Sequence, residues 1–299
     1  MRAVPARELC GSVPPLVTPF RKGEVDLEAY ASQIEHQVRC GSHGLLVNGT
    51  SAEPSTLTIE ERNRLVSTAV EVADGRLPVI AATGSQSFAE TLELTRHAER
   101  AGADALLVVT PYYIRPPQRG LVQYYTELCR TTSLPVLIYH IPGRAAVGLE
   151  LESLEQILEA APNLVGMKHA VDDLGFVTRA LERLGRGFRI FVGLEELSFP
   201  MLALGACGMM NAVANVDPAR VAALYEAVAA GDLERARNLH YALAELNRSV
   251  FFDTNPIPVK YMMRRLGLLE RNEHRLPMCP PTPELASRLD RVLAQAGLR

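Results

Sequence analysis

A single lysine, Lys168, lies in the mostly apolar stretch from Leu164 to Ala170. Such a stretch is typical of a parallel strand that is covered on both faces. Burial without a partner disfavours the ammonium form, and a neutral amine at a strand end is a nucleophile toward carbonyl carbon. Lys168 is therefore a candidate for Schiff-base chemistry. The alternative is a lysine whose stem follows apolar surface while its charged head reaches water or a carboxylate.

Hydroxyl groups follow two other apolar stretches. Tyr139 lies near the end of the stretch 136–141, and its phenol can pass a proton to a bound reactant if a second hydroxyl relays it. Thr50 and Ser51 follow Gly49 and could hold a carboxylate oxygen through hydroxyl and backbone donors. The alternatives are a tyrosine packed in the core and an ordinary loop that leads into the next helix.

Arg144 and the pair Tyr112 and Tyr113 complete the candidate set. A guanidinium can bind a substrate carboxylate through two parallel hydrogen bonds, or it can pair with a surface acid to little effect. Tyr112 and Tyr113 are candidates because they directly follow another apolar stretch. They could also be packed aromatic side chains whose hydroxyls reach water.

Two histidines, His140 and His169, directly follow Tyr139 and Lys168. Successive side chains of a strand point to opposite faces. We therefore expect both histidines to pack between the strands and the outer helices and to take no part in the chemistry.

Eight short apolar stretches recur along the chain, and an amphipathic segment follows each of them. The expected strands are 13–18, 45–48, 79–83, 105–110, 136–141, 164–169, 190–193 and 209–214. The expected helices are 26–40, 58–73, 87–101, 118–132, 149–160, 172–184, 196–204 and 217–230, and several begin at Asp, Ser or Thr. This alternation predicts an α/β protein with a (β/α)8 TIM barrel, because an open sheet usually has fewer parallel strands.

Beyond residue 230 the pattern predicts helices alone, at 233–248, 255–266 and 282–298, interrupted by the proline-rich segment 276–283. We therefore expect two units, a catalytic barrel over residues 1–230 and a C-terminal helical subdomain over residues 231–299. Active sites of TIM barrels lie at the carboxyl ends of the strands. The candidate residues end or follow expected strands, so they should gather on one face.

Composition argues against several classes of function. The chain has 31 basic and 34 acidic residues and a formal net charge of -3, so it lacks the excess of positive charge that would favour binding to nucleic acid or to a membrane surface. No stretch reaches the ~18 apolar residues of a membrane-spanning helix, and the first residues lack a signal-peptide pattern, so a cytoplasmic location is expected. The five scattered cysteines indicate reduced thiols and no metal site.

Four motifs at four expected strand ends resemble those of one family. They are GTSAE at 49–53, VTPYY at 109–113, YHIPGR at 139–144 and GMK at 166–168. In this order they resemble the dihydrodipicolinate synthase and N-acetylneuraminate lyase superfamily of class I pyruvate-type aldolases. Two further segments, NPIPVK at 255–260 and LPM at 276–278, particularly resemble the dihydrodipicolinate synthase branch.

This resemblance implies a lyase that forms a Schiff base between Lys168 and the carbonyl carbon of pyruvate or another 2-oxo acid. It also implies a proton relay through Tyr139, Thr50 and Tyr113, with the pyruvate carboxylate held at Thr50 and Ser51. The imine is an electron sink that makes an enamine accessible, and the enamine then attacks an aldehyde. The reverse reaction breaks a carbon-carbon bond and releases pyruvate. No cofactor or metal is implied.

The same resemblance assigns three further roles. Arg144 would hold the carboxylate of aspartate semialdehyde, so an acidic aldehyde is expected as the second substrate. Met210, in the eighth expected strand, would be a substrate-binding residue. Tyr113 would enter the site of the neighbouring subunit, which makes a homodimer the smallest active unit and a homotetramer the expected assembly.

Some positions depart from the synthase pattern. Ser51 replaces a Thr, Ala52 a Gly and His140 an Asn, while Gly-Leu-Glu-Glu at 193–196 replaces Gly-Asp-Asp. Because these positions border the second-substrate pocket, a second function stays open: cleavage of a 4-hydroxy-2-oxo (di)carboxylic acid to pyruvate and an aldehyde. A non-catalytic family member is a third alternative, which the presence of the lysine and both tyrosines disfavours.

Regulation by lysine is not expected. Where lysine-inhibited synthases carry histidines, an Asn and a Glu beside the dimer interface, this chain has Ile59, Arg62, Gln86 and Glu90. An apolar Ile59 and a cationic Arg62 should disfavour a ligand that carries an ammonium group, because like charges repel.

Overall fold

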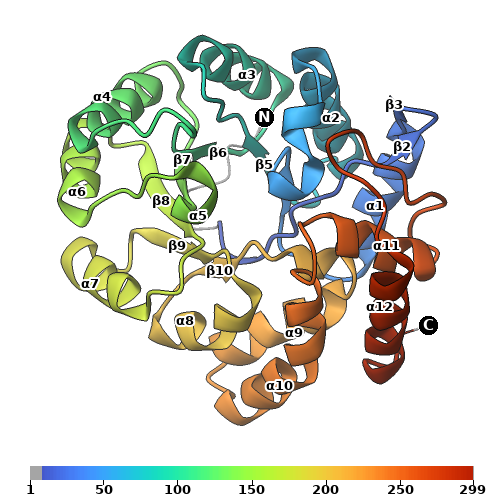
Figure 1. Cartoon of the computed structure of the whole chain (residues 1–299). Coiled ribbons are helices and arrows are strands. Elements are labelled where there is room, and N and C mark those ends of the chain that lie inside the picture. Colours follow the sequence, from blue (N-terminus) through green and yellow to red (C-terminus); the bar gives the residue numbers. More distant parts are fainter. Residues whose placement is uncertain (1–8, 299) are drawn as a thin grey trace.

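The computed structural model describes residues 9–298, in which eight parallel strands form a ring inside a layer of helices (Figure 1). A parallel bridge between Pro15 and Leu46 joins the two ends of the sheet and closes the ring. The predicted (β/α)8 TIM barrel is confirmed. In sheet order the strands are β1 (Gly11–Ser12), β10 (Gly208–Met209), β9 (Arg189–Val192), β8 (Leu164–His169), β7 (Val136–His140), β6 (Ala105–Val109), β5 (Val79–Ala82) and β4 (Leu45–Val47).

The first and last strands of the ring are shorter than predicted, which corrects the ranges 13–18 and 209–214. Pro14 and Pro15 have no N–H group to donate, so the regular ladder of β1 ends before them. After β10 the chain turns into the 3-10 helix η5 (Ala212–Asn215), which carries it out of the sheet.

The helices of the outer layer lie where the sequence predicts them, with ends that differ by a few residues. Asp, Ser or Thr side chains cap many of them, and Thr58 and Glu61 form a reciprocal capping box at α2. The helices around the barrel are α1 (Leu27–Arg39), α2 (Ile59–Ala73), α3 (Phe88–Ala101), α4 (Gln118–Cys129), α6 (Leu151–Ala160), α7 (Leu174–Leu184), α8 (Ser198–Leu204) and α9 (Pro218–Ala229).

Some short elements were not predicted. A hairpin of β2 (Phe20–Arg21) and β3 (Glu24–Val25) precedes α1, and the four-residue helix α5 (Pro142–Ala145) follows β7. The predicted helix 196–204 begins instead as the 3-10 helix η4 (Glu195–Leu197) and continues as α8. These elements are too short for a helical or strand period to emerge from the sequence.

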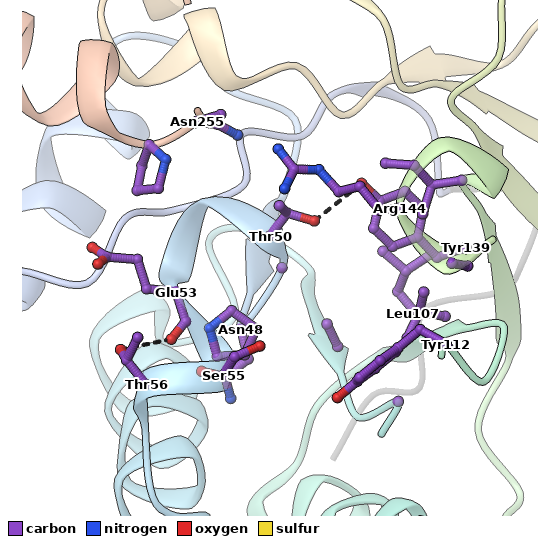
Figure 2. A pocket seen from close by; sticks show the side chains of 18 of the residues that line it. Asn48, Thr50, Glu53, Ser55, Thr56, Leu107, Tyr112, Tyr139, Arg144 and Asn255 are labelled. Carbon is purple, nitrogen blue, oxygen red and sulfur yellow. Dashed lines mark hydrogen bonds between the residues drawn. The ribbon is translucent and has the colours of Figure 1, made fainter. Parts of the chain in front are cut away.

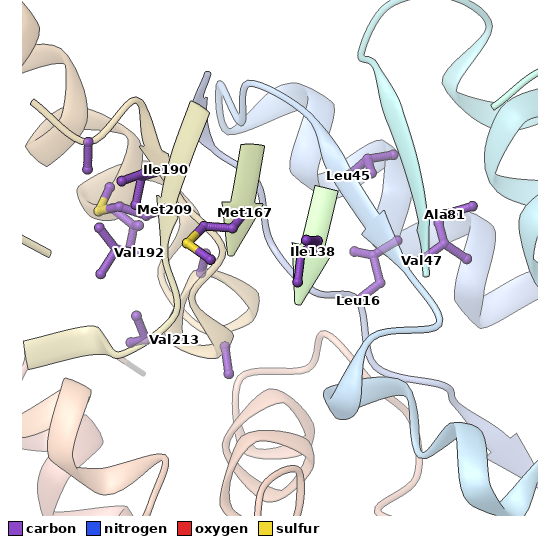
Figure 3. Close-up of a cluster of buried hydrophobic side chains, with 14 of the residues drawn as sticks. Leu16, Leu45, Val47, Ala81, Ile138, Met167, Ile190, Val192, Met209 and Val213 are labelled. Atoms are coloured by element: carbon purple, nitrogen blue, oxygen red, sulfur yellow. The ribbon is translucent and has the colours of Figure 1, made fainter. Parts of the chain in front are cut away.

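Side chains alternate between the interior of the barrel and the helix layer. Leu45, Val47, Ile138 and Met167 belong to the buried cluster between strands and helices, as Figure 3 shows. Leu46, between two of them, packs inside the barrel. Burying one such aliphatic side chain contributes roughly 1.5–3 kcal/mol, so this alternation fixes which face of each strand looks inward.

Gly166 sets the close approach of β8 to β9. In the ladder Gly166 is opposite Arg189, and a Cβ atom at Gly166 would collide with the Arg189 carbonyl group. Only glycine avoids this clash. The resulting register places Lys168 opposite Phe191 of β9 on one side and opposite Tyr139 of β7 on the other.

The C-terminal helices pack on the barrel. Helix α10 (Leu233–Ser249) lies against α9, and α11 (Ile257–Arg265) contacts both η5 and α12 (Pro283–Gln295). They form the orange and red part of Figure 1. The division of the chain at residue 230 into a barrel and a helical subdomain stays a prediction.

Other predictions concern membranes, metals and thiols. Within residues 9–298 no helix is both long and apolar enough to cross a bilayer. In the same residues no group of three or more His, Cys, Asp and Glu side chains could hold a metal ion. All five cysteines are free thiols, and Cys279 is the exposed one.

Candidate active site

Lys168 and Tyr139 lie side by side near the carboxyl ends of β8 and β7. They are Cα partners in the ladder, and their exposed fractions are 4% and 7%. The Lys168 ammonium lies 4.5 Å from the centroid of the Tyr139 ring, within the range of a cation-π contact. The lysine side chain is thus buried against an aromatic face at the catalytic end of the barrel, where a substrate carbonyl can reach it.

Thr50 lies on the other side of Tyr139. Asn48 takes a left-handed backbone conformation (φ 59°) after β4, and the chain then forms the 3-10 helix η2 (Thr50–Ala52). This turn brings Thr50 Oγ1 to 3.1 Å from the Tyr139 hydroxyl oxygen, and either group can donate (Figure 2). A proton relay needs such a contact between hydroxyls.

Ser51 is buried and bonded to the C-terminal region of the chain. Its Oγ accepts a hydrogen bond of 2.9 Å from Asn255 Nδ2. Asn255 precedes α11, so this bond joins the turn after β4 to the start of that helix. The sequence had singled out Asn255 only as part of a motif, without a role.

Two adjoining cavities form the site. The smaller one, of about 50 Å³, contains Lys168, Ser51 and Met210, and Met210 is almost fully buried directly after β10. The larger one, of about 360 Å³, extends toward Tyr112. Five residues line both cavities and make them one site: Thr50, Tyr139, Ile141, Arg144 and Asn255.

Arg144 lies on α5, directly after β7, and its side chain is exposed. Pro142 begins this helix, and Ala146 ends it in a left-handed conformation (φ 57°). Figure 2 shows the guanidinium beside Thr50. An exposed guanidinium that lines the cavity can bind an acidic substrate without the cost of burying an unpaired charge.

Tyr113 is not brought into the site of its own chain. It is 85% exposed and lines neither cavity, whereas its neighbour Tyr112 lines the larger one. The Tyr113 backbone has a positive φ of 72°, which is uncommon for a bulky residue and sets its direction at this point of the loop. Of the three hydroxyl groups in the predicted relay, those of Tyr139 and Thr50 contact each other within one chain.

His140 and His169 pack outside the barrel as expected. Their Nδ1 atoms are 3.2 Å apart, and both rings stack with Phe176 of α7. Burial lowers the pKa of each histidine to about 4, so both are neutral at physiological pH. Both histidines therefore have a structural role in the packing of strands against helices.

Glu195 is a buried acid in the lysine cavity that the sequence had noted only as a departure. It is the first residue of η4, which leads into α8, and its exposed fraction is 2%. Oε1 accepts a hydrogen bond of 2.6 Å from Ala212 N. Burial raises the pKa of Glu195 to about 7, against the opposing effects of backbone donors and of the Lys168 charge. The sequence feature that could have pointed to Glu195 is an acidic residue just beyond the carboxyl end of a barrel strand.

A buried ion pair supports the site from the side of the larger cavity. Lys260 Nζ lies 2.8 Å from Glu53 Oε1, and both side chains are almost fully buried. Burial alone would raise the pKa of Glu53, but His274 and Lys260 hold it below its ordinary value. Glu53 follows η2, so this pair anchors the Thr50 turn to α11.

Comparisons with known proteins agree with this geometry. The chain matches the profile of the Dihydrodipicolinate synthetase family over residues 8–296. A 4-hydroxy-tetrahydrodipicolinate synthase of Thermus thermophilus is 46% identical over 289 residues, 96% of this chain and 96% of that protein.

Solved structures give the same result. The dihydrodipicolinate synthase of Aquifex aeolicus superposes with a TM-score of 0.95 at 39% identity, over 97% of this chain and 99% of that one. The chloride-inhibited dihydrodipicolinate synthase of Acinetobacter baumannii, complexed with pyruvate, has a TM-score of 0.94 at 33% identity, over 97% and 100% of the two chains. The chain, with its lysine and tyrosine paired at the catalytic end of a (β/α)8 barrel, is therefore a member of the dihydrodipicolinate synthetase family of lyases.

Proposed function

We propose that this protein joins pyruvate to aspartate semialdehyde through a Schiff base on Lys168, as a 4-hydroxy-tetrahydrodipicolinate synthase does. The observation that carries the proposal is the arrangement of a buried lysine against Tyr139, whose hydroxyl contacts Thr50. Relatives with that name match nearly the whole chain, and one similar structure was solved with pyruvate.

The proposed mechanism begins with the amine of Lys168. Its nitrogen attacks C2 of pyruvate, while hydroxyl and backbone donors of Thr50 and Ser51 hold the carboxylate. The carbinolamine loses its oxygen as water, and the Tyr139 hydroxyl carries protons between nitrogen and oxygen with the help of Thr50. The cationic imine then releases a proton from C3, and the enamine carbon forms a bond to the aldehyde carbon.

Arg144 would select the second substrate. Its guanidinium borders both cavities, on the side where an aldehyde would approach the enamine. A guanidinium binds a carboxylate with two parallel hydrogen bonds, so an aldehyde that carries a carboxylate is favoured over a neutral sugar aldehyde.

Trapping and a substrate panel test this function. Borohydride reduction with pyruvate should add a reduced three-carbon fragment to the peptide that contains Lys168. Lys168→Arg should abolish turnover, because a guanidinium stays protonated and cannot attack a carbonyl group. Purified protein should consume pyruvate with aspartate semialdehyde. An adduct on another peptide would disprove the lysine assignment, and faster cleavage of 4-hydroxy-2-oxo acids would reassign the reaction.

We further propose that a second copy of the chain supplies Tyr113, in a homodimer or a homotetramer. The exposed Tyr113 ring is outside both cavities of its own chain, next to the exposed Ile114. Such a side chain can reach a neighbouring subunit. The expected cytoplasmic location also stays a prediction.

Mixed oligomers test the shared site. Lys168→Arg and Tyr113→Phe subunits should each have little activity alone. A mixed dimer should regain activity, because the Tyr113→Phe subunit keeps its lysine and receives an intact tyrosine from its partner. If Tyr113 acted within its own chain, mixing would restore nothing.

A further inference from the structure

Glu195 is a buried ionisable group that the mechanism above does not use. It lines the same cavity of about 50 Å³ as Lys168. One carboxylate oxygen is bonded to Ala212 N, while Oε2 has no hydrogen-bond partner among residues 9–298. An unpartnered carboxyl oxygen is costly to bury as an anion, unless a positive charge shares the cavity.

We propose that Glu195 is the charge partner of Lys168: the pair shares one proton in the free enzyme, and Glu195 is the anionic counter-charge of the cationic imine. This inference rests on the proposed function and extends it to a residue that acts through Lys168. Glu195 is therefore a positioning residue for the charge of the lysine nitrogen and does not itself bond to substrate.

The proton balance of imine formation gives the pair its role. The nitrogen of Lys168 forms a bond to the 2-oxo carbon, the carbon-oxygen bond breaks, and the oxygen leaves as water. Starting from the neutral amine, the cationic imine needs one extra proton. If Glu195 donates that proton, its carboxyl becomes a carboxylate beside the new cation, and the cavity keeps its net charge. No proton then has to come from solvent.

The electrostatic surroundings of Glu195 fit this role. Burial favours the acid, while backbone donors and the Lys168 charge favour the anion, and the balance raises the pKa of Glu195 to about 7. Tyr139 and Arg144 border the same cavity from β7 and α5, and Lys168 borders it from β8. The next acid, Glu196, is 60% exposed and lies 3.5 Å from Arg248 of α10. On the α8 and α10 sides, Ser198 Oγ and Asn247 Nδ2 donate to the backbone carbonyl oxygen of Glu195 and not to its carboxyl group.

The test is the pH dependence of pyruvate affinity, measured by imine trapping from about pH 7.5 to about pH 9. In the wild type, affinity should change little, because the pair already holds the proton. In Glu195→Gln the cavity no longer contains the carboxyl group that would donate this proton. Each imine then takes one proton from solvent, so affinity should fall about tenfold per pH unit.

Two further variants complete the design. Glu195→Asp keeps a carboxyl group, so its pyruvate affinity should show the weak pH dependence of the wild type even if that affinity is lower. It serves as the second test if Glu195→Gln does not fold. Glu196→Gln makes the same chemical change at an exposed neighbour and should behave as the wild type. Thermal melting checks that each variant is folded.

The outcomes separate this inference from the proposed function. If the wild type forms no imine at Lys168, the proposed function itself fails. If the wild type forms the imine and Glu195→Gln loses affinity equally at every pH, Glu195 has only a structural role and the inference is overturned. A tenfold change per pH unit in Glu195→Gln, absent from Glu195→Asp, supports it.

Discussion

The ring of Tyr139 contacts the ammonium of Lys168 at 4.5 Å, while the hydroxyl of the same tyrosine lies 3.1 Å from Thr50 Oγ1. Tyr139 and Lys168 are opposite each other in the adjacent strands β7 and β8, so the backbone hydrogen bonds between these strands set their spacing. One side chain thus has two separable contacts: its ring with the nucleophile, and its hydroxyl with the proposed relay.

We expect Tyr139→Phe to lower kcat by about 100-fold or more, because it keeps the ring but removes the proton-carrying hydroxyl. Thr50→Val should also lower kcat. The double variant should lose little more than Tyr139→Phe alone, since members of one relay are non-additive. Steady-state kinetics of the three variants provide the measurement. Losses that multiply independently would show that the two hydroxyls do not act as a unit.

Arg144→Ala should lower kcat/KM for an acidic aldehyde by about 10- to 100-fold, equivalent to roughly 1.5–3 kcal/mol for a charged hydrogen-bonded contact. Imine formation with pyruvate should stay largely intact. Arg144→Lys is the matched control. It keeps the positive charge but loses the planar guanidinium with its two parallel N–H donors, so it should lower kcat/KM nearly as much. An equal loss of pyruvate binding and aldehyde use would show that Arg144 contributes to binding pyruvate instead.

Lysine should inhibit weakly. Arg62 borders the larger cavity, and its guanidinium is buried and donates to the carbonyl oxygens of Ala82 and Gly84. Burial lowers the pKa of Arg62, but arginine stays cationic in proteins and repels an ammonium ligand. Inhibition assays with lysine provide the check. A midpoint below about 1 mM, equivalent to about -4 kcal/mol of binding, would contradict this expectation.

Lys260→Met should destabilise the fold by about 3–5 kcal/mol, because it leaves the buried Glu53 carboxylate without its cation. Adding Glu53→Gln to this variant should recover part of the loss, since it removes the uncompensated charge. Urea unfolding provides the measurement. Arg265→Ala is a control at an exposed ion pair with Asp290 and should change stability little. If Lys260→Met and Arg265→Ala lowered the free energy of unfolding equally, burial of the ion pair between Lys260 and Glu53 would not matter for stability.

Parts of the fold could be predicted because they depend on local patterns. The strand 164–169 was predicted with the bounds that β8 has, since a buried parallel strand is a continuous apolar run. The first strand was predicted too long, because an apolar composition does not reveal that Pro14 and Pro15 interrupt the ladder. The short helix α5 was missed, although it carries Arg144, because four residues show no helical period.

The sequence by itself determined the alternation of strands and helices and Lys168 as the candidate nucleophile, because these follow from periodicity and from residue types at strand ends. The family was identified from the resemblance of four motifs at those strand ends. Only the tertiary structure decided which side chains meet. It places Tyr113 outside the cavities of its own chain and Glu195 in the cavity of Lys168. Such placements join segments far apart in sequence, so they depend on loop dihedrals and on the closure of the whole barrel, neither of which a local pattern encodes.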